Sequence, residues 1–131
     1  MREGRLRRQG GSAAIEFALV LPLFLLLLSL ILEYGWYFTN WLALTNGVSE
    51  GARAGIKARE WEGEDPVALA RQAFQEAFRF NVTPTVNITI EDDSPRKIRV
   101  DVSFRYEPLV GYLPDALTPR RVAARAVMAF P

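Results

Sequence analysis

Glu16 is the residue whose position most needs a chemical explanation, because no other residue between Arg8 and Glu33 is charged. A carboxylate inside a membrane helix costs about 2.5 kcal/mol or more near the bilayer centre and less near its edge, so it is by default functional and needs a partner. If the chain were cut after Gly11, Ser12 would become the N-terminus and Glu16 the fifth residue. The carboxylate could then pair with the α-ammonium group of a neighbouring subunit, which would neutralise both charges.

The element that positions Glu16 is an uncharged, leucine-rich run over residues 17–32. As a helix its sixteen residues extend about 24 Å, which is short of the roughly 30 Å hydrocarbon core. The helix gains length from residues 13–15 and from aromatic residues typical of the membrane–water interface, which are Tyr34, Trp36, Tyr37, Phe38 and Trp41. We therefore predict a span over residues 13–37, with the Glu33 carboxylate near the outer boundary, where it reaches water.

The flanks of this run predict its orientation. The leader has a net charge of +3, from Arg2, Arg5, Arg7, Arg8 and Glu3. The positive-inside rule then places the N-terminus in the cytoplasm and the rest of the chain outside it. A cleaved secretory signal would need a small-residue site after the apolar run, and residues 29–34 offer none. A plain signal anchor explains the leader and the run but not Glu16.

The sequence around Gly11 resembles the processing site of type IV pilin-like proteins. The residues that carry the resemblance, after a short basic leader and before an unbroken apolar helix, are Gly11, Ser12, Ala13, Ala14, Ile15, Glu16 and Phe17. The Glu16–Phe17 pair and the stretch IEFALVLPLFLLLL are similar in particular to the TadE family of tight-adherence (Tad, or type IVc) pilus systems. The stretch VSEGARAG at residues 48–55 and the tail over residues 98–130 extend the resemblance.

The resemblance implies a minor pilin or pseudopilin of a Tad pilus or secretion apparatus. A membrane-bound prepilin peptidase would cut after Gly11, so that the mature chain begins at Ser12 and assembles through Glu16 and Phe17. The implied partners are this peptidase, other pilin-like subunits and the lipid of the bacterial inner membrane, with the C-terminal domain periplasmic or extracellular. The alternative is an uncleaved single-pass membrane protein with an exported binding module, which the position of Glu16 disfavours.

The composition argues against other classes of function. The chain has no cysteine and no histidine, which removes thiol catalysis and the commonest general base and metal ligand. No nucleophile–base pair can be named, so we predict no catalytic residue and no enzyme. The acidic run over residues 91–93 lacks the pattern of a calcium loop, and we predict no metal and no cofactor. Twelve basic and twelve acidic residues follow Thr45, which leaves no footprint for nucleic acid, and nothing indicates a small-molecule substrate.

We predict four regions: a basic leader (residues 1–11), a transmembrane helix with its outer interface (12–45), a stalk helix (46–60) and a small exported α+β domain (61–131). The stalk continues the membrane helix, because apolar residues recur at steps of three and four at Tyr37, Trp41, Leu44, Val48, Ala52 and Ile56. Gly47, Gly51 and Gly55 each cost about 1 kcal/mol relative to alanine in a helix. Either they form a surface without side chains against which another helix can pack closely, or they mark a flexible linker.

The exported domain is expected to hold one helix and three strands. Asp65 and Pro66 begin an amphipathic helix over residues 66–80. Alternating apolar residues predict strands over residues 86–90, 98–106 and 122–130, which form an antiparallel sheet packed on the stalk and on the second helix. The Pro-rich connection over residues 107–119 either covers the core, as we expect, or faces a partner; its apolar residues are Leu109, Val110, Tyr112 and Leu113.

Overall fold

The computed structural model describes the backbone of residues 3–131 and the side chains of residues 11–131. Its elements, in chain order, are α1 (Glu3–Ile56), a 3-10 turn η1 (Glu60–Glu62), α2 (Pro66–Ala77), β1 (Thr85–Glu91), β2 (Lys97–Arg105), a second 3-10 turn η2 (Asp115–Leu117) and β3 (Arg121–Ala129). A long N-terminal helix, a short second helix and a three-stranded antiparallel sheet confirm the predicted α+β fold.

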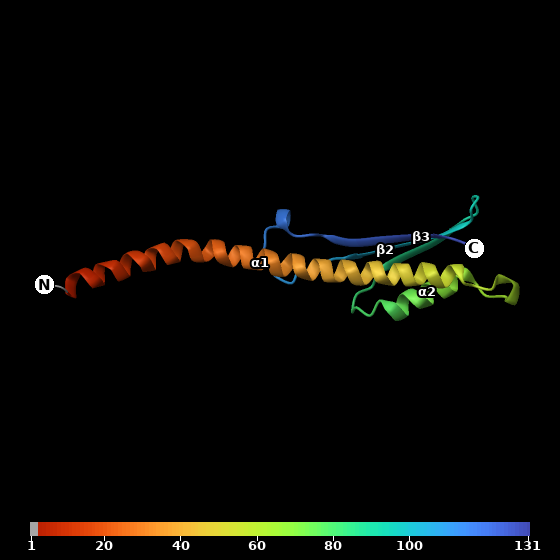
Figure 1. Ribbon diagram of the computed structural model, residues 1–131, viewed down its shortest axis with the longest axis horizontal. Helices are drawn as coiled ribbons and strands as arrows, with labels where there is room; N and C mark the ends of the chain where they lie inside the picture. Colours follow the sequence, from red (N-terminus) through yellow and green to blue (C-terminus); the bar gives the residue numbers. More distant parts are fainter. Residues whose placement is uncertain (1–2) are drawn as a thin grey trace.

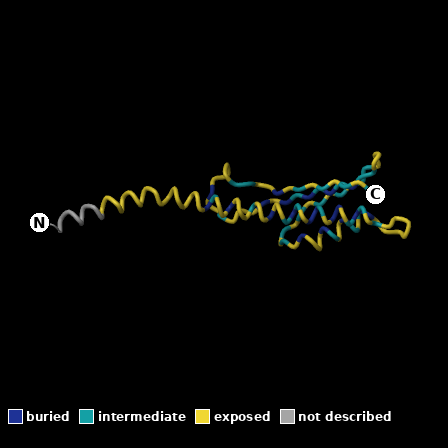
Figure 2. Tube along the Cα trace, in the orientation of Figure 1, coloured by how far each residue is buried: buried dark blue, intermediate teal, exposed yellow. Residues whose placement is uncertain are grey.

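Helix α1 joins the predicted membrane span and stalk in one element. It runs through Pro22 without a break and curves gently in its N-terminal half (Figure 1). Within the described chain, α1 is the one helix long and apolar enough to cross a membrane. Residues 11–28 are exposed on every side, whereas the later part of α1 has buried residues on the side that faces the rest of the chain (Figure 2). The chain therefore has a bare apolar rod and a folded head on the same helix.

The sheet has the strand order β1-β2-β3 and lies along one side of α1, while α2 lies along another (Figure 1). In its register Val100 of β2 lies between Ile88 and Ala126. The outer face is polar and carries the ion pairs Arg99–Glu91 and Arg125–Asp101. All three strands begin and end within a residue of the predicted bounds, because the alternation of apolar and polar residues matches a sheet with one buried face.

The core lies between α1, α2 and the inner face of the sheet. Its buried residues are Leu44, Val48 and Ala52 from α1, Ala70 and Phe74 from α2, Phe78 just after α2, Ile98, Val100, Val102, Phe104 and Val122 from the sheet, and Tyr106 just after β2. Trp41 does not belong to this core, although the sequence pattern placed it there. It is 42 % exposed, and the neighbouring Asn40 is buried instead, because the buried face of α1 passes through position 40.

Helix α2 begins as predicted and ends earlier than predicted. The Asp65 carboxylate accepts a hydrogen bond from the Val67 amide at 2.9 Å, and Pro66 occupies the first turn. The predicted end at residue 80 is wrong, because Phe78 already has an extended backbone. From that position its ring contacts Phe74 and Phe104 in the core.

The three glycines spaced four apart on α1 face α2. A Cβ atom at Gly51 would lie 2.9 Å from the Ala70 carbonyl oxygen, and one at Gly47 would lie 3.2 Å from Phe78 Cβ. At Gly55 it would lie 2.4 Å from a terminal methyl of Ile98. The two helices thus approach so closely that a side chain at Gly51 would meet the backbone of α2.

We predict that Gly51→Ala destabilises the domain even though alanine is the better helix former by about 1 kcal/mol. The new methyl must push the α2 backbone away, and overpacking of this kind costs roughly 1–3 kcal/mol. Thermal unfolding of the full chain in detergent micelles measures the effect. Gly35→Ala is the matched control, because a Cβ there meets nothing within 4 Å. Equal stability of Gly51→Ala and Gly35→Ala would contradict the close approach.

Candidate functional site

The N-terminal motif lies on the bare part of α1. Gly11, Ser12, Glu16 and Phe17 are all exposed, and Phe17 retains 65 % of its surface. The Ser12 hydroxyl donates a hydrogen bond to Glu16 Oε1 at 3.2 Å, one helical turn away. Among the side chains of residues 11–131, none provides a cation to Glu16. The charge of this carboxylate is therefore not neutralised within the described part of the chain.

The glycine strip is occupied within the subunit itself. Gly47, Gly51 and Gly55 are buried against α2, with Ile98 of the sheet also close to Gly55. The structure therefore does not bring these glycines together with the N-terminal motif. They join the stalk to the head, and their surface is not available to a neighbouring helix.

Glu33 is a second acid on α1, and the structure buries it completely. Its exposed fraction is 0 %, so the expectation that its carboxylate reaches water is wrong. The Tyr106 hydroxyl donates to Glu33 Oε1 at 2.5 Å and to the Glu33 carbonyl oxygen at 3.1 Å. The amides of Leu109 and Val110 donate to the carboxylate at 3.3 and 2.8 Å. Three donors that follow strand β2 thus converge on one carboxylate of the membrane helix.

These contacts fasten the β2–β3 loop, residues 106–120, along α1. The hydroxyls of Ser29 and Tyr112 form a hydrogen bond one turn before Glu33, and the Tyr34 hydroxyl donates to the Leu117 carbonyl oxygen at 3.2 Å. The expectation that the loop covers the core is wrong for Leu109 and Tyr112, which are 54 % and 71 % exposed, and Leu113 is buried outside the core cluster. The loop covers α1 rather than the core.

The electrostatics of Glu33 explain why the β2–β3 loop is held against α1. No cation among residues 11–131 lies within ion-pair distance of Glu33, so hydrogen bonds alone compensate its burial. Hydrogen bonds to a charged acceptor are shorter and stronger than those between neutral groups. Burial, and then the hydrogen bond to Glu33, raise the pKa of the Tyr106 hydroxyl above its ordinary value of 10.0. The hydroxyl therefore remains a donor over the whole physiological range.

The sequence contains a signal for this site. Ser29 and Glu33 are one turn apart, and the same face of α1 continues through Tyr37 and Leu44 into the core. A serine and a glutamate that extend an apolar face toward the membrane predict a polar partner on that face. The interpretation of Glu33 as a residue at the water boundary hid this periodicity.

The described residues offer little for other chemistry. Across residues 11–131 no group of three or more Asp and Glu side chains is placed to hold a metal ion. The site consists instead of a bare helix that carries one acid and a head fastened to that helix by a second acid.

These features define a class of protein in which a small α+β head is carried on one long N-terminal helix that is apolar enough to cross a membrane. Residues 11–53 match the family described as TadE-like protein, which confirms the resemblance over the helix and stalk. The match begins at Gly11 and includes Glu16, Glu33 and Gly51. The tail over residues 98–130 lies outside it, so that part of the resemblance stays a prediction. No curated protein and no solved structure matches the chain.

We predict that Tyr106→Phe destabilises the head by about 1.5–3 kcal/mol, the usual contribution of a hydrogen bond to a charged group. Tyr34→Phe is the matched control, because it removes an exposed hydrogen bond from the same loop. Thermal unfolding in micelles and proteolysis of the β2–β3 loop measure the two variants. A Tyr106→Phe variant as stable as Tyr34→Phe would show that the Glu33 contact is not structural.

The same hydroxyl predicts a pH dependence. Because the pKa of Tyr106 is raised in the folded state, its contribution to stability is present below the ordinary value of 10.0 and decreases as the pH rises above it. The wild-type chain should thus lose stability above about pH 10 more steeply than Tyr106→Phe. Parallel stability curves for the two chains would contradict the raised pKa.

Proposed function

We propose that the chain is a minor pilin or pseudopilin-like component of a Tad pilus or secretion apparatus. The observation that carries the proposal is the bare segment of α1, residues 11–28, with a carboxylate near its start and no cation from the side chains of residues 11–131. The match of this segment to the TadE-like family supports the same role.

The length of the bare segment suits a membrane anchor that later packs against other helices. Its eighteen residues extend about 27 Å as a helix, close to the roughly 30 Å hydrocarbon core. The head first contacts α1 at Ser29, so nothing described in the chain obstructs lateral packing before that residue. Neighbouring apolar helices could therefore surround this segment on all sides.

The mechanism in this proposal is assembly. The apolar helix inserts with the basic leader in the cytoplasm, and a prepilin peptidase cuts between Gly11 and Ser12. The new α-ammonium group then lies one helical turn from Glu16 in the sequence. In a bundle of staggered helices, the amine of one subunit neutralises Glu16 of the next, which removes the cost of an unpaired charge in an apolar environment.

Gly11→Leu tests the processing step. We predict that it blocks maturation, because the site should need a residue with little or no side chain, and Gly11 itself has open space around it in the fold. A gel shift in cells that contain the peptidase, followed by N-terminal sequencing, measures the product. Gly35→Leu is the control, since Gly35 is equally unobstructed but lies far from the cleavage site. Maturation of Gly11→Leu at the normal rate would contradict the proposed site.

Glu16→Ala separates anchoring from assembly. The substitution removes a carboxylate that is costly in a lone membrane helix, so insertion and cleavage should proceed normally. In an assembly it leaves each α-ammonium group unpaired, at a cost of roughly 3–5 kcal/mol, and Glu16→Gln should be nearly as defective because it supplies no charge.

Co-isolation of each variant with the other pilin-like subunits measures this effect, after a gel shift has shown that cleavage occurred. Glu50→Ala is the matched control, because Glu50 is an exposed acid on the same helix and pairs with Arg53. Normal co-isolation of Glu16→Ala would remove the main physical support for assembly through this charge. An uncut chain that begins at Met1 would instead favour the anchored binding module.

A further inference from the structure

The β2–β3 loop presents apolar side chains to the surroundings at a particular height along α1. Leu109, Tyr112 and Leu117 are 54 %, 71 % and 38 % exposed. On α1 beside them, Tyr34 and Trp36 are 40 % and 39 % exposed. An exposed group of this kind marks an interaction surface rather than ordinary solvated surface.

The hydrogen bonds of the β2–β3 loop determine where along α1 its exposed apolar side chains lie. Tyr112 contacts Ser29, which is the residue directly after the bare segment of about 27 Å. If residues 11–28 fill the hydrocarbon core, the tip of the loop lies at its boundary. Tyrosine and tryptophan favour this boundary, because the ring is apolar and its polar atom reaches water.

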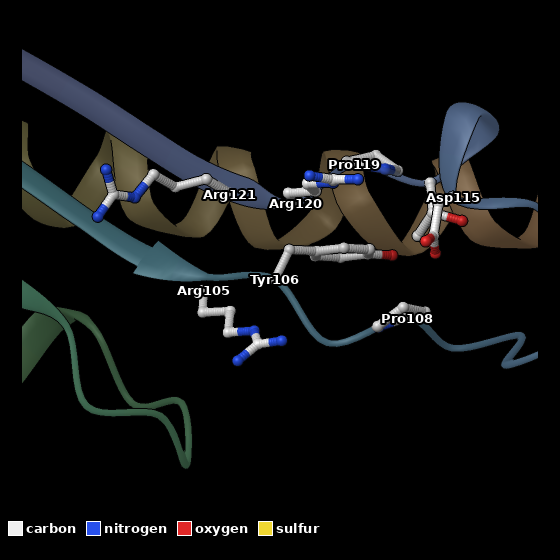
Figure 3. Close-up of a pocket in the computed structure, with 8 residues that line it drawn as sticks. Arg105, Tyr106, Pro108, Asp115, Pro119, Arg120 and Arg121 are labelled. Carbon is white, nitrogen blue, oxygen red and sulfur yellow. The ribbon is translucent and has the colours of Figure 1, made fainter.

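A basic hollow lies farther along the head from the hydrocarbon core of the bilayer, where strand β2 ends and strand β3 begins. Its volume is about 610 Å³, and its charged lining consists of Arg105, Arg120, Arg121 and Asp115. Three arginines and one aspartate give a net charge of +2. None of these arginines forms an ion pair with a carboxylate of residues 11–131. Arg120 extends in the same direction as the Tyr106 ring, toward Asp115, while Arg121 points the opposite way (Figure 3).

The end of the hollow at Asp115 lies at the depth of phospholipid headgroups. The neighbouring Leu117 accepts a hydrogen bond from Tyr34, which is five residues or about 7.5 Å beyond Ser29 on α1. Arg120 extends toward this end of the hollow (Figure 3). The headgroup layer on each side of a bilayer is roughly 5–8 Å thick. Arginine binds phosphate through several parallel hydrogen bonds, so an unpaired arginine at this depth fits a lipid phosphate.

We propose that the β2–β3 loop is a second membrane anchor, which inserts its apolar tip into the leaflet on the side of the head. Arg105 and Arg120 bind the phosphate groups of anionic phospholipids above it. The proposal needs α1 to span a membrane but does not depend on cleavage or on assembly into a pilus. It means that the head rests on the membrane surface instead of moving freely above it.

The chain has no cysteine, so single cysteines can carry a nitroxide spin label. The full chain is reconstituted in vesicles of phosphatidylcholine with phosphatidylglycerol, and the accessibility of each label to oxygen and to a water-soluble nickel complex is measured. Leu109→Cys and Leu117→Cys report on the loop, and both side chains are exposed without hydrogen bonds of their own. Leu25→Cys is the control for the hydrocarbon core, and Trp61→Cys, on a residue 81 % exposed, is the control for water.

The expected result is that both loop labels are shielded from nickel and accessible to oxygen, between the two controls. Loop labels as accessible to nickel as the label at position 61 would overturn the anchor. A label at position 25 that is accessible to nickel would overturn the span itself and with it the proposal. Loop labels that are in water in vesicles but shielded in an assembled pilus would show that a neighbouring subunit covers this surface, which also overturns the lipid assignment.

The arginines are tested separately by native mass spectrometry of the full chain released from mixed-lipid nanodiscs. Arg105→Gln and Arg120→Gln should each lower the preference for retained phosphatidylglycerol over phosphatidylcholine roughly fivefold, since each basic residue near the surface contributes about this factor. Arg71→Gln is the matched control, because Arg71 is an exposed arginine of α2 that does not line the hollow and has no ion pair among residues 11–131. An equal preference in all three variants would overturn the headgroup site.

Discussion

The arrangement of the molecule depends on one buried carboxylate. Glu33 lies on the helix that is long and apolar enough to cross a membrane, and its donors come from the segment that follows strand β2. An isolated carboxylate in this position would be strongly unfavourable, so the loop cannot leave without exposing an uncompensated charge. This constraint ties the last third of the chain to α1 at the height where the bare helix ends, and it fixes where lipid can surround the helix.

Glu16 and Glu33, both on α1, differ in how the fold satisfies them. Glu33 is satisfied entirely by its own chain, whereas Glu16 receives one hydrogen bond, from Ser12. The head can therefore be stable before Glu16 has a partner, and a partner that binds at Glu16 need not disturb the head.

The sequence was sufficient to predict the architecture, because the spacing of apolar residues indicates which face of a helix or strand is buried. Alternation predicted all three strands, and the Asp65–Pro66 pair predicted the start of α2. Contacts between residues far apart in the chain were not predictable in this way. The partner of Glu33 lies more than seventy residues away, at Tyr106, and no local pattern connects them. The role of the glycines also required the structure, since only the position of α2 decides between a packing strip and a soft link.

The continuity of α1 has a mechanical consequence. The helix extends about 81 Å over its 54 residues, and neither Pro22 nor the glycines interrupt it. The head is attached to it along several turns, so there is no flexible joint between the bare segment, residues 11–28, and the head. A turn of the buried segment about its own axis must therefore turn the polar outer face of the sheet by the same angle. Torque applied to the bare segment of α1 is thus transmitted to the head.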